Sequence, residues 1–492
     1  MSFSMQPHSG TVDQPSAFSM TAVRLYSGDA ALDQAFRIAL GDLAGNIVPF
    51  KDGLLDSERA ALLAGLDYDT PWTRDTAINT WNGTGLLFPP VTYNTLLSVL
   101  TREGDTVRIG GQYWDAIIWA LGAWWQYVYT GDAAFLSLAF AAVRNSLASL
   151  EASEFSPELN LFRGPACYGD GVAAYPDIYA HTNGSSSILD WPAANPGLVS
   201  TPGYGLPMHA LSTNCLYYEA YVLLERMARE LGLPSDPAWS QKAQALKDAI
   251  NTHFWHPATG SYRYLVDPFG NSECQEGMGH AFALLFGIAN KEQADAVLRH
   301  QHITAHGISC VWPPFARYNS EDGMSFGRHC GVVWPHIAAF WAQATLEHGR
   351  TDLFANELYQ LAHKACRDSQ FAEIYHPLTG AIYGGAQEGR SQWKSCSRQS
   401  WSATGYLRMI FMGLFGMRFD PHGITFSPTL LDRLDGLALY NLPYRSMLVD
   451  IEVRGQGERV LECAINGKPV EAPILPAGGR GRQTVVIHLG ES

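Results

Sequence analysis

A turn of six residues that occurs twice, each time after a helical stretch, constrains the fold most. Trp255-His-Pro-Ala-Thr-Gly260 recurs as Tyr375-His-Pro-Leu-Thr-Gly380, and a looser copy begins at Phe155-Ser-Pro157. Proline stops a helix and glycine supplies the turn, so each copy predicts a helix end followed by an extended return. A repeated unit of paired helices is typical of a toroid or a solenoid.

Apolar residues spaced three and four apart support this prediction between about residues 29 and 418. Leu216, Ala220 and Leu223, for example, share one face of a helix. Many such windows are apolar on more than one face, as expected for helices that pack between neighbours. Together they predict about ten to twelve helices, and hence a mainly α fold.

The character of the sequence changes near both ends of this helical region. Residues 1–28 are polar and predict an N-terminal arm, whereas residues 29–418 form the predicted helical domain. Residues 419–492 alternate between apolar and polar residues as short strands do, and predict a small C-terminal β-domain that is not separately catalytic. Asn466-Gly467 predicts a hairpin turn within it.

Charge and composition argue against several classes of function. Asp and Glu outnumber Lys and Arg by 47 to 33, the opposite of what a phosphate-binding surface needs, so no nucleic acid is expected. The chain has no basic amphipathic stretch and no run of 18 apolar residues, so no membrane partner is expected either. Whether the chain forms a homo-oligomer stays open.

The cysteines and the first residues bear on location and cofactors. The eight cysteines are scattered without a C-x-x-C pair, which predicts reduced thiols in the cytoplasm and no zinc or redox cofactor. The first residues lack the basic and apolar regions of a secretory signal. An exported chain without its signal would look the same, and a structural calcium ion stays open.

Aromatic residues make up 12% of the chain, including 14 Trp and 22 Tyr. Sugars present apolar C–H faces beside hydroxyls, so carbohydrate sites favour such rings with polar side chains between them. A large aromatic core would explain the same composition.

Three loop regions in the first half carry candidate site residues. Helix caps, a buried ion pair and simple turns would each explain the presence of these residues without a functional role. Asp170 lies between two glycines of a long loop, where burial in a closed pocket would raise its pKa and suit a general acid. The candidates in these loops are Trp72, Arg74, Asp75, Trp81, Gln112, Trp114, Asp170 and Asp177.

The second half adds a further carboxylate. Glu373 lies just before the repeated turn, which does not itself require an acid there, whereas Glu388 matches Glu276 in the sister loop and could be structural. Further residues that could line the same pocket are Trp312, Arg328, His329, Trp334, His336 and Trp401. Core packing would explain Arg328, His329, Trp334 and His336 equally well. Two carboxylates on distant loops among aromatic rings are the arrangement used in glycoside hydrolysis.

Several of these segments resemble the six-hairpin glycosidases, which include glycoside hydrolase family 63, the trehalases, the glucoamylases and the glycogen-debranching α-glucosidases. The segments are Trp72-Thr-Arg74-Asp75, the helical repeat, Glu373 to Gly380 and Gln399-Ser-Trp401. The resemblance covers about residues 29–418. It implies an (α/α)6 toroid barrel, here followed by a small C-terminal β-sandwich-like domain.

The resemblance also implies an inverting mechanism. Our hypothesis is an exo-glycosidase that hydrolyses a short, α-linked glycoside without a cofactor. Trp72, Arg74 and Asp75 would hold the sugar hydroxyls, Glu373 would be the general base, and Trp401 matches the Trp-Ser that follows this base. Glu388 stands where trehalases carry a second site glutamate. Asp170 would be the general acid, with Asp177 as the alternative at this point.

Two other kinds of function stay open at this stage. A phosphorylase, polysaccharide lyase or sugar epimerase could use the same scaffold, with His329, His336 or Tyr375 taking part in proton transfer. A non-catalytic glycan-binding protein would lack the two opposed carboxylates.

Overall fold

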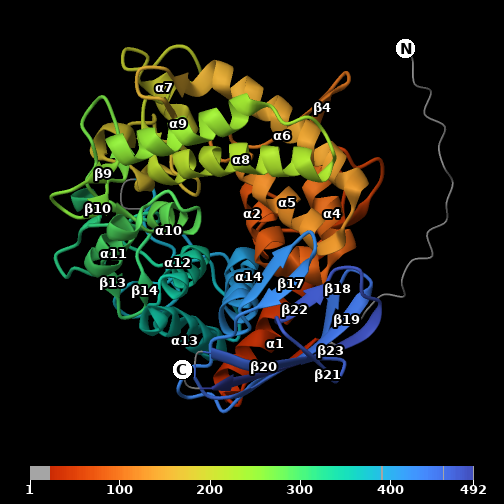
Figure 1. The fold of residues 1–492 in the computed structure, drawn as a ribbon. Helices are drawn as coiled ribbons and strands as arrows, with labels where there is room; N and C mark the ends of the chain where they lie inside the picture. The colour runs from red at the N-terminus through yellow and green to blue at the C-terminus, as the bar shows by residue number, and fades with distance from the viewer. Residues whose placement is uncertain (1–22, 389–391, 458, 491–492) are drawn as a thin grey trace, which may run out of the picture.

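The computed structural model describes residues 23–388, 392–457 and 459–490. Figure 1 shows helices arranged in a ring, with the C-terminal strands against one side of it. The mainly α fold and the strand-rich C-terminal region are therefore confirmed.

Six helices contact one another in sequence order to form the inner wall of the ring, and the last of them, α14, returns to contact α2. The inner helices are α2 (Thr73–Asn79), α5 (Trp119–Thr130), α8 (Leu211–Glu230), α10 (Gly277–Leu285), α12 (Pro335–Glu347) and α14 (Ser400–Arg408).

A second set of helices alternates with the inner ones along the chain and lies outside them (Figure 1). These outer helices are α1 (Ala30–Gly45), α4 (Pro89–Ser98), α6 (Ala133–Glu154), α9 (Pro237–His253), α11 (Lys291–His300) and α13 (Thr351–Asp368). The short helices α3 (Gly85–Leu87) and α7 (Trp191–Ala194) lie between them in sequence. Because inner and outer helices alternate, successive inner helices can begin at the same end of the ring.

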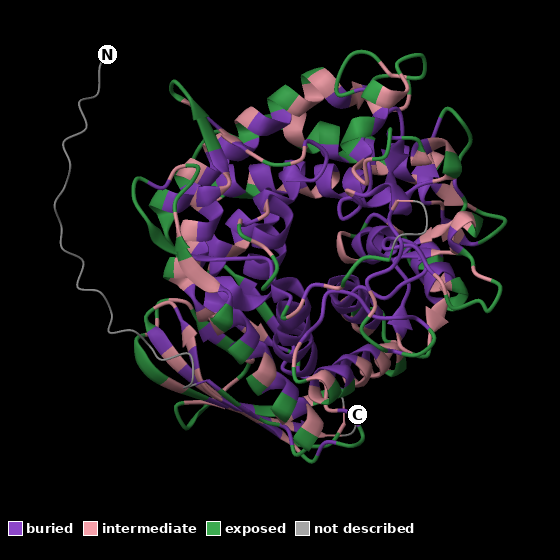
Figure 2. Ribbon diagram, turned by 180° about the vertical axis from the view of Figure 1, so that it is seen from behind, coloured by how far each residue is buried: buried purple, intermediate pink, exposed green. Residues whose placement is uncertain are grey.

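The residue pattern explains which helices lie inside. Every residue of α2 and α14 is buried, whereas α9 buries only Ala243, Leu246, Ala249 and Ile250 along one stripe. A helix with one apolar stripe suits the outer layer, and a helix that is buried all round needs neighbours on every side. Figure 2 shows this division, with buried residues facing the centre and exposed residues at the rim.

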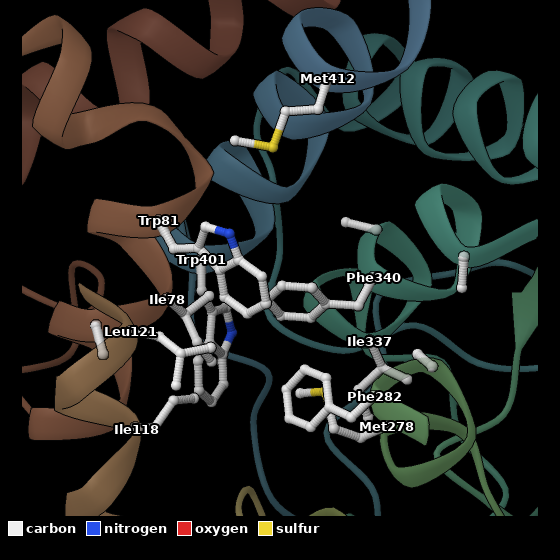
Figure 3. Close-up of a cluster of buried hydrophobic side chains, with 14 of the residues drawn as sticks. Ile78, Trp81, Ile118, Leu121, Met278, Phe282, Ile337, Phe340, Trp401 and Met412 are labelled. Atoms are coloured by element: carbon white, nitrogen blue, oxygen red, sulfur yellow. The ribbon is translucent and has the colours of Figure 1, made fainter. Parts of the chain in front are cut away.

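Side chains from the inner helices converge on the centre of the ring (Figure 3). Ile78 from α2, Phe282 from α10, Phe340 from α12 and Trp401 from α14 belong to one buried hydrophobic cluster.

The repeated turns adopt the predicted geometry. β6 (Phe155–Ser156) pairs with β7 (Leu161–Phe162), and β9 (Trp255–His256) pairs with β10 (Ser261–Tyr262). Gly260 and Gly380 have φ angles of 64° and 66°, and Asn160 takes this left-handed position in the first copy with φ 52°. The prediction of a helix end, a tight turn and an extended return is confirmed.

Further short antiparallel pairs connect the helices. They are β2 (Ile47–Phe50) with β3 (Arg59–Leu62), β4 (Leu100–Glu103) with β5 (Thr106–Ile109), β8 (His209–Ala210) with β11 (Leu265–Val266), β12 (Gln275–Glu276) with β15 (Val311–Trp312), and β13 (Ile303–Thr304) with β14 (Gly307–Ile308).

The C-terminal strands form two sheets. One has three strands in the order β16 (Met417–Asp420), β17 (Gly423–Phe426) and β22 (Ile474–Pro476). The six-stranded sheet has the order β1 (Arg24–Tyr26), β18 (Leu437–Tyr444), β19 (Met447–Gly455), β23 (Gly481–Gly490), β20 (Arg459–Ile465) and β21 (Lys468–Val470). Its β20–β21 hairpin turns at Asn466-Gly467, as predicted, with both residues in the left-handed region.

The first strand corrects the expected N-terminal arm. Arg24–Tyr26 was predicted to belong to the arm 1–28, but it forms β1 and pairs with β18 of the C-terminal sheet. Leu25 is buried there, so its side chain anchors this segment. Residues 1–22 of the predicted arm lie outside the described residues.

One helix of the described chain, α6, is long and apolar enough to cross a membrane by length and composition alone. It packs in the outer layer against α5 and α8, and the core helices of soluble proteins pass the same test.

Buried Glu276 predicts a pH-dependent stability. Burial raises its pKa to about 8, although Ser212 donates hydrogen bonds to it. The folded protein therefore keeps a proton that the unfolded chain releases above its ordinary pKa, so stability falls as pH rises toward 8. We expect Glu276→Gln to remove this loss. The free energy of unfolding of the variant, relative to that of the wild-type protein, should be higher at pH 8 than at pH 5 by on the order of 2 kcal/mol. Thermal unfolding between pH 5 and 8 measures it, with the exposed Glu273→Gln as control; parallel pH profiles for all three proteins would contradict the assignment.

Candidate active site

A pocket of about 280 Å³ opens at one end of the ring. Residues that line it come from the connecting segments that precede α2, α8, α12 and α14, among them Trp72, Asp170, Trp334 and Glu373. The alternation of inner and outer helices thus brings loops that are far apart in sequence to one place. Among residues 23–388, 392–457 and 459–490, those that line it are Tyr68, Trp72, Arg74, Asp75, Gln112, Tyr168, Asp170, Ser186, Ser187, Arg328, His329, Trp334, Glu373, Gln387, Trp393 and Trp401.

Asp170 lies in the loop between β7 and α8, which is tied down by its own backbone. Its carbonyl accepts from the N–H of Ile188 at 3.0 Å, and the N–H of Val172 donates to Ser186 at 2.9 Å. Its carboxylate lies between two cationic or potentially cationic groups, 3.5 Å from Arg74 Nη2 and 3.4 Å from His329 Nε2. About a third of the side chain, 33%, remains exposed.

The proton affinity of Asp170 differs from the expectation. We expected burial to raise its pKa. Burial does act in that direction and is the largest influence, but the hydrogen bond from His329 and the charges of Arg74, His329 and Arg328 together lower the pKa below its ordinary value. In the unliganded pocket, Asp170 is therefore an ionised carboxylate.

Glu373 lines the same pocket and is held there by three donors. Its Oε1 accepts from the Tyr68 hydroxyl at 3.0 Å, and its Oε2 accepts from Arg328 at 2.5 Å and from the N–H of Cys396 at 3.0 Å. Burial and the charges of Glu373, Asp75 and Asp170 raise the pKa of Tyr68, so its phenol keeps the proton that it donates. These contacts fix the orientation of a buried carboxylate.

Arg74 connects the pocket to a second buried carboxylate beneath it. One Nη contacts Asp115 and Gln112, and the other points to Asp170. Burial raises the pKa of Asp115 to about 7, against the opposing charge of Arg74. Burial likewise raises the pKa of the neighbouring Asp75 to about 7. Removing Arg74 would leave Asp115 buried without its ion-pair partner, so we expect this arginine to stabilise the fold as well as to line the pocket.

Aromatic rings form the walls, and imidazoles support two of them from behind. His329 stacks on Trp334 with 5.0 Å between centroids, and His336 stacks on Trp401 at 4.0 Å. Arg74 lies over the Trp401 ring at 5.6 Å, so the charged and aromatic parts of the pocket are in contact. Rings beside fixed polar groups match the C–H faces and hydroxyls of a sugar.

Ten of the residues expected at a site line this pocket. They are Trp72, Arg74, Asp75, Gln112, Asp170, Arg328, His329, Trp334, Glu373 and Trp401.

Trp81 lies at the opposite end of the ring. Residues 73–79 are helical rather than loop, and at about 1.5 Å per residue this carries Trp81 roughly 10 Å from Arg74 along the axis. There it lines a separate cavity of about 220 Å³, with Arg408 over its ring at 4.2 Å.

Two further expected residues support the pocket without lining it. Trp114 is fully buried behind the Asp170 loop, where its indole N–H donates to the carbonyl of Ala166 at 3.1 Å. His336 is buried behind Trp401, and burial is the main cause that lowers its pKa well below the ordinary value, so it stays neutral.

The remaining three expected residues lie away from the pocket. Asp177 is 77% exposed and forms an ion pair with Arg317 at 2.7 Å, because a short helical turn carries it to the surface. Trp312 in β15 stacks on His302 at 3.8 Å. Glu388 is half-buried beside the turn at Gly184 and does not line the pocket.

Comparisons with known proteins identify the family of the chain. The sequence pattern of the mannosylglycerate hydrolase MGH1-like glycoside hydrolase domain matches residues 85–402, more than half of the chain. The chain belongs to the MGH1-like glycoside hydrolase family. It is therefore a glycoside hydrolase, and the resemblance to the family 63 glycosidases is confirmed. No curated protein matches the chain.

Solved structures share the fold of this MGH1-like hydrolase at low sequence identity. The GH63 mannosylglycerate hydrolase from Thermus thermophilus, in complex with glucose, is 15% identical with a TM-score of 0.56, over 76% of this chain and 100% of that one. A GH78 rhamnosidase of Bacillus sp. GL1 is 13% identical with a TM-score of 0.59, and a sialidase is 12% identical with a TM-score of 0.63. The MGH1-like chain spans only 44% of the rhamnosidase and 37% of the sialidase.

The sequence did not single out several residues that line the pocket of the MGH1-like hydrolase. They are Tyr68, Tyr168, Ser186, Ser187, Gln387 and Trp393. Gln387 directly precedes Glu388, and Tyr68 lies seven residues before Asp75. Their closeness in sequence to these candidate residues was the one signal that could have predicted them as pocket residues. Ser186 and Ser187 had none, because they reach the pocket only through pairing with the Asp170 loop.

Among residues 23–388, 392–457 and 459–490, no group of three or more His, Cys, Asp or Glu side chains is arranged to hold a metal ion.

Proposed function

We propose that this MGH1-like hydrolase is an inverting exo-glycosidase with an (α/α)6 barrel, which hydrolyses a short, α-linked glycoside with Asp170 as general acid and Glu373 as general base. One observation carries the proposal: the two carboxylates come from separate loops and line the same pocket. An inverting enzyme needs such a pair on opposite faces of the sugar, with room for one water.

The shape and lining of the pocket support an exo mode of action. Its volume of about 280 Å³ suits the end of a small glycoside rather than a polysaccharide chain. Trp72, Arg74 and Asp75 would bind the terminal sugar, and the partly exposed Trp393 would face the leaving group at the mouth. Asp177 is the weaker candidate for the acid because it lies at the surface.

The two carboxylates would divide the chemistry between them. Glu373 would take a proton from the attacking water, in the orientation set by Tyr68, Arg328 and the N–H of Cys396. Asp170 would protonate the leaving oxygen. A bound sugar would displace water from its exposed third and so raise its pKa toward the range in which it can carry that proton.

The same contacts weigh against a phosphorylase. Arg74 and Arg328, the arginines among the described lining residues, are already paired with carboxylates, Arg74 with Asp115 and Arg328 with Glu373. A phosphate would have to compete with those carboxylates for its cations.

A substrate screen tests the proposal. It covers aryl α- and β-glycosides, disaccharides, mannosylglycerate and rhamnosides, with and without phosphate. We expect phosphate-independent hydrolysis of a short α-glycoside. Release that requires phosphate, or an unsaturated product absorbing in the ultraviolet, would replace hydrolysis with phosphorolysis or elimination.

A further inference from the structure

Asp170 is contacted by an imidazole that the two-carboxylate mechanism does not use. His329 lies just before α12, is 2% exposed, and directs Nε2 to Asp170 Oδ1 at 3.4 Å. An ionised carboxylate can only accept, so Nε2 must carry the hydrogen in this contact. Trp334 covers one face of the imidazole ring, and Nδ1 is buried without a hydrogen-bond partner, so the ring is held by stacking and by its contact with Asp170.

We infer that His329 is a positioning residue for the proton transfer of the proposed glycosidase reaction: it binds Oδ1 of Asp170 and leaves Oδ2 to carry the proton given to the leaving oxygen. The inference rests on the proposed function. In the step, the Oδ2–H bond of Asp170 breaks as an O–H bond forms on the glycosidic oxygen. The electron pair of the cleaved C–O bond stays on that oxygen. The carboxylate so formed accepts from the Nε2–H of His329, which keeps its proton throughout.

The charged groups around this pair favour the same division of oxygens. Arg74 donates to Oδ2 at 3.5 Å and His329 lies 3.4 Å from Oδ1, so both contacts are long. Arg74 is also held by Asp115 and Gln112 through its other terminal nitrogen, so a ligand at Oδ2 has only this one long contact to replace. Hydrogen bonds of this kind are often long in an empty site and shorten when substrate binds. The Nε2–H of His329 is then the donor that stabilises the carboxylate as it forms.

Other titratable groups face this pair from every side. His336 in α12 stays neutral, and burial raises the pKa of Tyr168 far above neutral pH. Arg328 is a fixed cation already paired with Glu373. Asp75, with a pKa of about 7, also lines the pocket and will contribute to any pH profile. Asp75 is unchanged in each variant below, so differences between the pH profiles of the variants report on Asp170 and His329.

The test compares His329→Ala and His329→Gln on two probes of the sugar identified by the screen, its α-glycosyl fluoride and its 4-methoxyphenyl α-glycoside. Fluoride leaves with little help from an acid, whereas 4-methoxyphenol needs protonation. We expect His329→Ala to lower kcat on the aryl glycoside by roughly 10- to 100-fold. Its kcat on the glycosyl fluoride should stay within about threefold of the wild-type value. The basic limb of its kcat/KM profile should move to higher pH, because an influence that lowers the pKa of Asp170 has been removed. His329→Gln, whose amide can donate to Oδ1, should restore part of the aryl rate.

His302→Ala is the matched control, because it removes another imidazole that stacks on a tryptophan, outside the pocket. Equal losses on both probes with an unmoved pH profile would reduce His329 to a packing role. So would an Ala variant of unchanged activity, or a Gln variant that folds normally but rescues nothing. Glu373→Gln is run in parallel: if that variant is fully active, the proposed function itself fails, whereas an inactive Glu373→Gln beside a normal His329→Ala overturns only the inference.

Discussion

Replacing Glu373 by Gln is expected to lower kcat by about 10²–10⁴-fold, because it removes the general base while keeping the volume of the side chain. An amide has no carboxylate charge with which to accept a proton from water. Arg328 would lose its ionic partner but could still donate to the amide oxygen. KM should change far less than kcat, since the proposed role is in the reaction rather than in binding.

The measurement is kcat and KM on the best substrate of the screen, with thermal unfolding to show that the variant is folded. Glu225→Gln is the control, because it removes another glutamate paired with an arginine, on the outside of α8. Near-normal turnover by a folded Glu373→Gln variant would end the assignment of the base.

Replacing Asp170 by Asn should have an effect that depends on the leaving group. We expect kcat on a glycoside with a poor leaving group to fall by about 10²–10⁴-fold, and hydrolysis of the glycosyl fluoride to fall by less than about tenfold. The amide cannot donate an acidic proton, but the base and the pocket remain. The fold should tolerate the change, because Asp170 is partly exposed and the backbone of its loop is fixed by Ile188 and Ser186.

Asp177→Asn is the comparison that separates the two candidate acids. Asp177 pairs with Arg317 at the surface, so its variant should retain near-normal rates on both substrates. If Asp177→Asn instead showed the dependence on leaving group and Asp170→Asn did not, the roles would have to be exchanged.

Local sequence was sufficient for features that depend on neighbouring residues. The helices, the repeated turns with Gly260 and Gly380, and the Asn466-Gly467 hairpin all follow from periodicity and backbone preferences. The pocket residues around Asp75 and Glu373 were found because motifs carried them. None of these features required knowledge of the ring.

Features that depend on the ring could not be read from the sequence. Trp81 is only seven residues from Arg74, yet the helix between them carries it to the far end. Asp170 was expected to be a desolvated acid, and nothing local showed that Arg74 and His329, from distant segments, would lower its pKa. Strand β1 joins the C-terminal sheet through a pairing across more than 400 residues, which no local pattern specifies.

The central claim is that Asp170 and Glu373 act on one bound sugar from opposite sides, with a water between the sugar and Glu373. Proton NMR of the first sugar released, recorded before mutarotation, tests it most directly. The arrangement predicts that an α-glycoside gives the β-anomer first. Release of the α-anomer first would show retention of configuration, and would contradict a water-activating role for Glu373.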